Sequence, residues 1–161
     1  MEFVKGKNLS QLFVENNCVM NIYQRKHIIR GILEGLVHMH EQYIVHRDIK
    51  PANIMIREDG AVKIVDLGLA TDIRELKYIH IRCGTLGFIG PEILALAKNS
   101  TERMTTKSDI FSVGVIMYEI LFKRSLFETW KDQKIVFEQN LKCGINFADI
   151  PYRPQTDLCS E

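Results

Sequence analysis

The sequence predicts a mainly α-helical fold that carries one short β-hairpin. In residues 21–40 the apolar positions recur at steps of three, four and seven, which is the pattern of a helix with one buried face. A second apolar segment covers residues 110–122. Between these segments, Asp59-Gly60 separates two β-branched runs, and Asp-Gly in that setting is a strong hairpin signal. Helices should therefore dominate, with the hairpin inserted between them.

Length, composition and charge are those of one ordinary soluble domain. The chain has 161 residues, of which 46% are hydrophobic and 25% are charged. A net charge of +1 gives no argument for a nucleic acid or an acidic membrane surface as partner. The start lacks the apolar core of a signal peptide, and the longest apolar stretch is shorter than the ~20 residues of a membrane helix. We therefore expect a monomeric protein of the cytoplasm or the nucleus, with its four cysteines as free thiols.

Local patterns predict the N-terminal elements in order. Residues 9–17 form a short helix that ends at an Asn pair, and residues 21–40 form the long amphipathic helix. Within the long helix, Gly31 and Gly35 lie one turn apart and would let another backbone approach closely. The hairpin strands cover residues 54–56 and 61–65.

The C-terminal half is predicted to hold three more helices after a long loop. Residues 66–92 show neither a helical nor a strand period over most of their length, as functional loops often do. Pro91 and Glu92 then open a helix that continues to about Ala97. The next helix, capped by Thr106, Ser108 or Asp109, is apolar around nearly its whole circumference and should be central to the core. Residues 130–141 form a last, partly exposed helix.

Two segments that flank the hairpin carry the residue types that phosphoryl transfer uses. Residues 46–53 read His-Arg-Asp-Ile-Lys-Pro-Ala-Asn, and thirteen positions after Asn53 comes Asp66. A carboxylate at Asp48 can orient a hydroxyl nucleophile, and a cation at Lys50 can neutralise charge on the moving phosphoryl group. Because Asn53 precedes the first strand and Asp66 follows the second, the hairpin brings an amide oxygen and a carboxylate towards one Mg²⁺ ion.

These segments are part of a wider pattern in which the chain resembles the catalytic domain of eukaryotic protein kinases, of the serine/threonine type. The resemblance rests on four motifs in order: His46-Arg47-Asp48 with Lys50 and Asn53, Asp66-Leu67-Gly68, Gly84-Thr85 with Gly90-Pro91-Glu92, and Asp109 in Ser-Asp-Ile-Phe-Ser-Val-Gly-Val. The match covers the larger, mostly helical C-terminal lobe up to about residue 145. It implies a protein-kinase-like α+β fold without the N-terminal-lobe sheet, so that residues 1–161 form a partial domain of hinge and C-terminal lobe.

The resemblance implies a role for each residue of the catalytic segments. Asp48 would be the catalytic base, Lys50 would contact the transferred phosphate, and Thr85 would hydrogen-bond with both. Asn53 and Asp66 would hold Mg²⁺. Asp109 would accept backbone N–H bonds from residues 46 and 47, bracing the loop that carries the base.

The resemblance also implies where ATP binds and what is modified. Residues 1–4 look like the hinge between the two lobes, with Met1 as gatekeeper. The backbone of Glu2 and Val4 would pair with adenine, and Met55 would lie under the ring as an apolar floor. The implied activity is transfer of the ATP γ-phosphate to Ser or Thr hydroxyls of protein substrates.

The chain departs from the family by what it lacks. No Gly-rich loop, strand lysine or partnered glutamate precedes Met1, and no convincing arginine partner for Glu92 follows. We therefore expect a piece of a longer kinase that transfers phosphate poorly by itself. A non-catalytic pseudokinase or a truncated lobe that binds partners is the alternative. A further alternative is a small-molecule phosphotransferase that shares Asp48, Asn53 and Asp66. The Gly-Thr…Pro-Glu segment, which by the resemblance shapes a groove for a peptide, argues against it.

Overall fold

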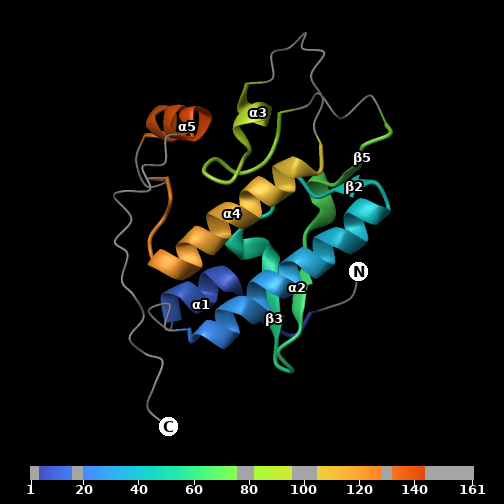
Figure 1. The fold of residues 1–161 in the computed structure, drawn as a ribbon, viewed down its shortest axis with the longest axis vertical. Coiled ribbons are helices and arrows are strands. Elements are labelled where there is room, and N and C mark those ends of the chain that lie inside the picture. Colours follow the sequence, from blue (N-terminus) through green and yellow to red (C-terminus); the bar gives the residue numbers. More distant parts are fainter. Residues whose placement is uncertain (1–3, 16–19, 76–81, 96–104, 128–131, 144–161) are drawn as a thin grey trace.

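The computed structural model describes residues 4–15, 20–75, 82–95, 105–127 and 132–143. They form a mainly helical body with two small antiparallel sheets (Figure 1). The helices are α1 (Leu9–Glu15), α2 (Ile22–Glu41), α3 (Pro91–Leu94), α4 (Lys107–Phe122) and α5 (Gln133–Lys142), with 3₁₀ turns η1 (Pro51–Asn53) and η2 (Leu67–Leu69). The strands are β1 (Gly6–Asn8), β2 (Ile44–Val45), β3 (Ile54–Arg57), β4 (Val62–Ile64) and β5 (Thr71–Asp72). The prediction of a mainly helical fold with a short hairpin is confirmed.

Helix α2 starts where the sequence predicts. The Asn21 side chain accepts a hydrogen bond from the Gln24 N–H at 2.9 Å, and the Gln24 side chain accepts one from the Asn21 N–H at 3.0 Å. This reciprocal pair is a capping box, which satisfies two N–H groups that a helix start leaves without partners. The predicted buried face is present, since Ile28, Ile32 and Leu36 are buried.

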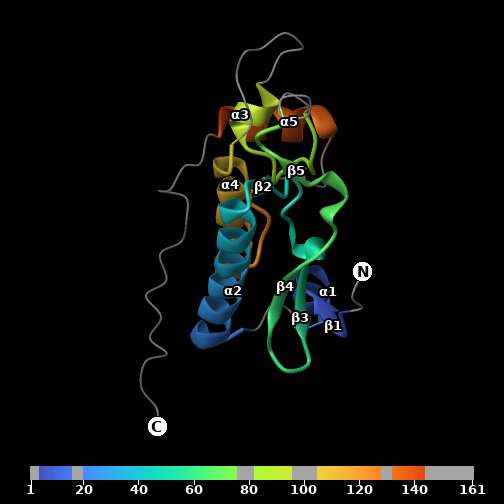
Figure 2. The same ribbon diagram turned by 90° about the vertical axis from the view of Figure 1, so that its right-hand side faces the viewer.

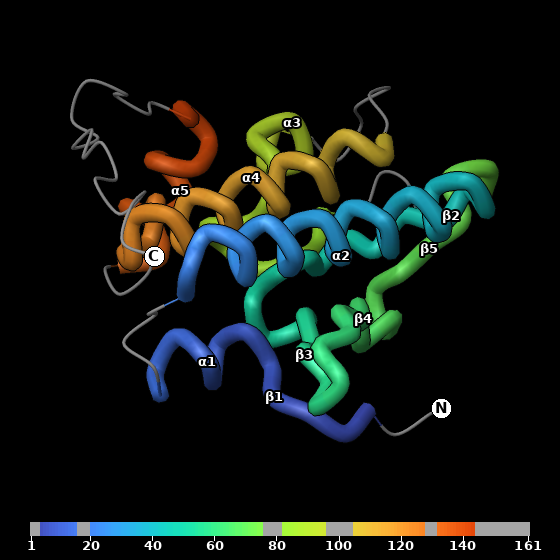
Figure 3. The backbone as a smooth tube through the Cα atoms, turned by 60° about the horizontal axis from the view of Figure 1, so that its bottom comes forward, coloured from blue at the N-terminus to red at the C-terminus, as the bar shows by residue number. Residues whose placement is uncertain are grey.

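Helix α4 joins two parts of the core and lies beside α2 (Figures 1 and 3). Ile116 and Ile120 are buried in the cluster that contains the α2 face, whereas Val115 belongs to a second cluster that reaches α5. The predicted central position is thus confirmed. Burial does not extend around the whole circumference, however, because Ile110 and Met117 are 47% and 46% exposed. The positions of apolar residues show which helix faces could be buried, whereas the packing of other elements decides which faces are buried.

The sheet contains more strands than the sequence predicts. The hairpin of β3 and β4 is confirmed, with Ile54 opposite Ile64. Strand β1, which was not predicted, pairs antiparallel with the other edge of β3. The two-residue strands β2 and β5 also pair with each other, so the predicted loop 66–92 contains one short strand. Strands of two or three residues are too short to show alternation, and only their tertiary partners define them.

Strand β4 packs closely on α2 at Gly31 and Gly35, and the atoms nearest to the two glycines are side-chain atoms of that strand. A Cβ atom at Gly31 would lie 2.6 Å from Cβ of Val62, and one at Gly35 would lie 2.9 Å from Cδ1 of Ile64. Both neighbours belong to β4, which runs along α2 (Figure 2). The two glycines therefore set how closely the hairpin packs on the helix.

We predict opposite effects for alanine at two helical glycines. Gly31→Ala should lower the free energy of unfolding by about 1–3 kcal/mol, because overpacking against Val62 outweighs the gain in helix propensity. Gly114→Ala in α4 should raise it by up to about 1 kcal/mol, because in the described residues no atom apart from the adjoining α4 backbone and chain neighbours lies within 4 Å of the added Cβ. Urea denaturation of both variants measures the difference. If both substitutions changed the free energy of unfolding equally, the close packing of Val62 against Gly31 would be refuted.

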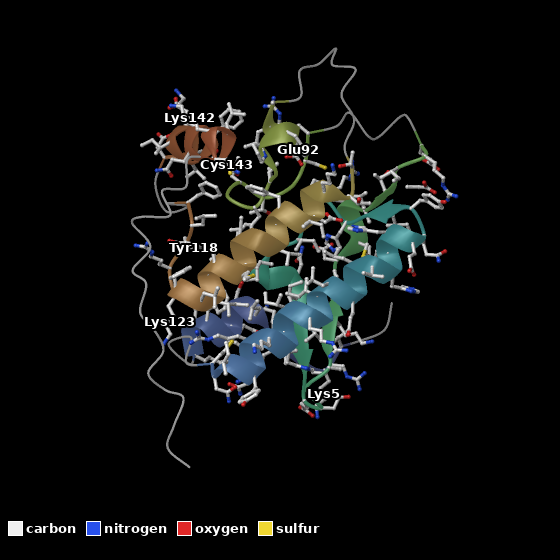
Figure 4. The ribbon with its side chains drawn as sticks, in the orientation of Figure 1. Lys5, Glu92, Tyr118, Lys123, Lys142 and Cys143 are labelled. Carbon is white, nitrogen blue, oxygen red and sulfur yellow. The ribbon has the colours of Figure 1, made fainter. Side chains whose placement is uncertain are left out.

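Helices α3 and α5 pack together at one end of the molecule (Figure 4). Helix α5 begins after Asp132, whose side chain accepts a hydrogen bond from the Lys134 N–H at 2.7 Å. The predicted ends of these helices at Ala97 and Trp130 lie outside the described residues. Glu92 in α3, for which the sequence offered no arginine partner, is exposed, so its carboxylate stays in contact with water. No helix in the described part of the chain is long and apolar enough to cross a membrane.

Candidate active site

Asp48 lies in the loop between β2 and η1 and is contacted by three polar side chains. Thr85 donates its hydroxyl hydrogen to Oδ1 at 2.6 Å, and Nζ of Lys50 lies 2.8 Å from Oδ2. Nδ2 of Asn53 donates to the same Oδ2 at 3.2 Å. Lys50 also donates to Thr85 Oγ1 at 2.9 Å. The predicted contacts of Thr85 with both Asp48 and Lys50 are therefore confirmed.

These contacts decide the charge of Asp48. Burial raises the pKa of this carboxyl, but the hydrogen bonds from Lys50 and Thr85 and the nearby ammonium outweigh burial and hold the pKa below its ordinary value. Asp48 is thus ionised at neutral pH. An ionised carboxylate can accept a hydrogen bond from an incoming hydroxyl and orient it.

Asp109 braces this loop from inside α4, as expected. Its side chain is fully buried and accepts hydrogen bonds from the N–H groups of His46 at 2.9 Å and Arg47 at 3.0 Å. Arg47 has φ 69°, a left-handed conformation that a residue other than glycine rarely adopts. The two N–H bonds hold the loop in this shape. Asp109 lies inside α4 and its side chain is used for the loop, so the alternative of an N-cap is wrong.

Sequence reasoning missed two histidines of the brace. Nε2 of His40, at the end of α2, lies 2.9 Å from Oδ2 of Asp109. The buried His46 ring accepts a hydrogen bond from the Asp48 N–H at Nδ1, so its Nε2 carries the proton and donates to the carbonyl of Val65 at 3.0 Å. No local pattern marks the contact of His40 with Asp109 or that of His46 with Val65, because the partners are 69 and 19 positions apart.

The hairpin brings the ends that carry Asn53 and Asp66 together, as predicted. The N–H of Val65 donates to the carbonyl of Asn53 at 3.0 Å, which places Asp66 one residue beyond a direct contact. Asn53 is buried, and its NH₂ group donates to the Asp48 carbonyl at 2.8 Å, so these bonds do not use Oδ1. Asp66 is exposed and has φ 63°. The amide oxygen of Asn53 and the carboxylate of Asp66 thus belong to adjacent segments, where both can serve as metal ligands.

The two oxygen donors, from Asn53 and Asp66, fit Mg²⁺ better than a metal ion that must be surrounded by three or four protein side chains. In the described ranges no group of three or more His, Cys, Asp and Glu side chains could hold a metal ion. Mg²⁺ is usually bound through one or two carboxylates and substrate phosphates, and it keeps several waters. Asn53 and Asp66 are oxygen donors of the kind that such an ion prefers.

The residues expected to contact adenine are only partly described. Glu2 and Met1 lie outside the described residues. Val4 is half-buried and lies just before β1. Met55 is half-buried in β3, between the core-facing Ile54 and Ile56, so alternation turns it to the opposite face of the sheet. This orientation leaves Met55 available as an apolar floor outside the core.

A pocket of about 630 Å³ adjoins the Asp48 network, and Glu119 lies at its wall together with Lys50 and Thr85. Burial raises the pKa of Glu119 to about 7, although a hydrogen bond with Ser125 opposes the rise. Sequence reasoning gave Glu119 no role. The available signal was a carboxyl group inside an otherwise apolar helical segment, which indicates a special environment.

We predict that Glu119 makes the fold less stable as pH rises. Between its ordinary pKa of 4.5 and about 7 the folded state binds more protons than the unfolded state, so the free energy of unfolding falls over this range. Glu119→Gln should therefore stabilise the protein by about 1–2 kcal/mol at pH 8, after allowance for solvent screening, and little at pH 5. Urea denaturation at both pH values measures this, with the exposed Glu41→Gln as control. A gain of equal size at both pH values would show that ionisation of Glu119 is not the cause.

Comparison with known proteins identifies the class to which this fold and site belong. The family model of the protein kinase domain matches residues 1–160, so the chain belongs to the protein kinase family. Sperm motility kinase 3A of Mus musculus is 34% identical over 136 residues, which are 84% of this chain and 26% of that protein. Serine/threonine-protein kinase cds1 of Schizosaccharomyces pombe is 37% identical over 123 residues, which are 75% of this chain and 26% of that protein.

Solved structures give the same fold. The yeast RNA Pol II CTD kinase CTDK-1 complex contains a chain that matches with a TM-score of 0.72 and 29% identity. The match covers 85% of this chain and 43% of that one. The protein-kinase-like fold is thereby established, and the chain spans about a quarter of the length of the two curated relatives above.

Proposed function

We propose that the protein is an ATP-dependent serine/threonine protein kinase, and that residues 1–161 are the hinge and C-terminal lobe of its catalytic domain. The observation that carries the proposal is the network around Asp48. One ionised carboxylate receives hydrogen bonds from Thr85, Lys50 and Asn53 and is braced by a buried acid on a neighbouring helix. A surface aspartate with no chemical task would not need this preorganisation.

In the proposed reaction, Asp48 accepts a hydrogen bond from a Ser or Thr hydroxyl of the substrate. As the hydroxyl oxygen bonds to the γ-phosphorus of ATP and the bond to the β-phosphate oxygen breaks, Asp48 takes the hydroxyl proton. Lys50, held by Asp48 and Thr85, places its ammonium where negative charge moves. Thr85 fixes the orientation of the Asp48 carboxylate. Mg²⁺ held by Asn53 and Asp66 would neutralise phosphate charge.

Binding of ATP is proposed for the surface that leads from Val4 to Met55, with the backbone of Glu2 and Val4 pairing with adenine. The serine/threonine preference follows from Lys50, two positions after the base, and agrees with the names of relatives such as cds1. We also propose that the protein acts as a monomer in the cytoplasm or nucleus.

A binding module without catalysis is the second candidate. Against it stands the presence of Asp48, Asn53 and Asp66 together, since a lobe that only binds partners has no need of all three.

Phosphotransfer by the complete protein tests the proposal. The protein should phosphorylate members of a Ser/Thr peptide library with ATP and Mg²⁺, and the product should contain phosphoserine or phosphothreonine. Residues 1–161 alone should remain below the 1–100 s⁻¹ typical of kinases, at roughly background rates. Absence of transfer by the complete protein, or phosphotyrosine as the product, would contradict the assignment.

A further inference from the structure

A buried asparagine in α5 holds the chain segment that follows Thr85. Asn140 has no exposed surface. Its Oδ1 accepts a hydrogen bond from the N–H of Gly87 at 3.0 Å, and its Nδ2 donates to the carbonyl of Ile89 at 2.7 Å. One side-chain amide thus bonds a donor and an acceptor of the same segment, as a neighbouring β-strand would. Within α5 the other buried residue is the apolar Val136, so Asn140 is the polar exception on that face.

The segment cannot keep its shape without such partners. Gly87 is buried and has φ 90°, a left-handed conformation. The middle carbonyl, that of Phe88, accepts a hydrogen bond from the Ser112 hydroxyl of α4 at 2.7 Å. Residues 87–89 are therefore fixed from two helices, α4 and α5, through side chains rather than through a sheet. A buried N–H or C=O that lost its partner here would remain unpaired, which is unfavourable.

This segment is directly joined to the catalytic network. The N–H of Phe88 donates to the carbonyl of Thr85 at 3.0 Å, and the Thr85 side chain contacts both Asp48 and Lys50. Leu86 and Phe88 line the 630 Å³ pocket next to Lys50. The position of residues 86–89 therefore sets one wall of the space beside the acceptor hydroxyl.

We propose that Asn140 is a positioning residue that sets the place where a protein substrate lies beside Asp48, by fixing the Gly87–Ile89 segment to α5. The inference rests on the proposed kinase function and deepens it. The occupant of the pocket is then the substrate polypeptide next to its acceptor residue, which meets an apolar wall of Leu86 and Phe88. Asn140 touches neither ATP nor the acceptor, so it affects peptide binding and leaves the use of ATP unchanged.

The test compares three variants of the complete protein. Asn140→Leu keeps the branching and the number of side-chain heavy atoms and removes both hydrogen bonds. Asn140→Asp keeps the acceptor for Gly87 N–H and loses the donor to Ile89. Ile120→Val, in the fully buried core of α4, is a control for a mild loss of packing that removes neither of the two Asn140 hydrogen bonds. Each is assayed with a peptide from the library and with ATP, and amide hydrogen exchange at Gly87 is measured separately.

We expect the KM for peptide to change and the KM for ATP to stay nearly the same. Asn140→Leu should raise the KM for peptide about tenfold, and Asn140→Asp should raise it at least as much, because its buried carboxylate meets the Ile89 carbonyl. In both variants the KM for ATP should stay within about twofold. Exchange at Gly87 should be faster in Asn140→Leu and unchanged in Ile120→Val. Equal rises in both KM values, or faster exchange at Gly87 with an unchanged peptide KM, would overturn the inference. If the wild-type protein transferred no phosphate, the proposed kinase function would be refuted instead. If exchange at Gly87 were unchanged in Asn140→Leu, the claim that Asn140 holds residues 87–89 would be refuted, whatever the kinetics.

Discussion

Replacing Asp48 by asparagine is expected to lower kcat of the complete protein by about 10²–10⁴-fold. The amide keeps the size of the side chain and can still accept a hydrogen bond from Thr85. It cannot accept the proton of the substrate hydroxyl, and it removes the charge that holds Lys50. Because the change acts on the transfer step, the KM for ATP should change much less than kcat. Steady-state kinetics with a library peptide measures both quantities.

Asp59→Asn is the matched control for this change. Asp59 lies in the exposed hairpin turn, and its Oδ1 accepts a hydrogen bond from the Ala61 N–H, which an asparagine retains. This variant should keep kcat within about twofold. If Asp48→Asn kept more than a fifth of the wild-type kcat, Asp48 would not be the base.

Replacing Asp109 by alanine is expected to lower the free energy of unfolding by about 3–5 kcal/mol. The fully buried carboxylate is the acceptor for two backbone N–H groups, and its removal leaves those of His46 and Arg47 without a partner in the interior. A loss of this size is a large part of the 5–15 kcal/mol that an ordinary domain has. Denaturation by urea measures the loss.

Two further variants separate the brace from general packing. Asp109→Asn, which retains one acceptor oxygen, should lose about half as much and remain folded enough for assay. Ser108→Ala, one position earlier, removes a single hydrogen bond to the Thr105 carbonyl and should cost about 1 kcal/mol. A cost for Asp109→Ala no greater than that for Ser108→Ala would contradict the brace.

Local signals were sufficient for the long elements of this fold. The period of three and four in residues 21–40 locates α2 to within one residue. Asp59-Gly60 locates the hairpin. Strands β1, β2 and β5 could not be predicted, because each has two or three residues and exists only through its partner. The neighbour of Gly31 could not be predicted either, since Val62 is placed beside it only once the hairpin is packed on the helix.

The candidate site divides in the same way. Asp48, Asn53 and Asp66 were found from their residue types and their positions around the hairpin, and the contacts of Thr85 followed from the kinase resemblance. His40 and Asn140 were not found. Each is a polar residue on a helix whose partner lies more than 50 positions away, and nothing in its own neighbourhood shows that it is buried.

Binding of a non-hydrolysable ATP analogue to the complete protein, measured by calorimetry with and without Mg²⁺, tests the central claim most directly. The claim is that the hairpin presents Asn53 and Asp66 to one divalent ion beside Asp48. Wild-type protein should bind the analogue more tightly with Mg²⁺, and Asp66→Asn should lose that increment, with an affinity at least about tenfold weaker in Mg²⁺. An Asp66→Asn protein that binds the analogue as tightly as wild type in the presence of Mg²⁺ would contradict the account.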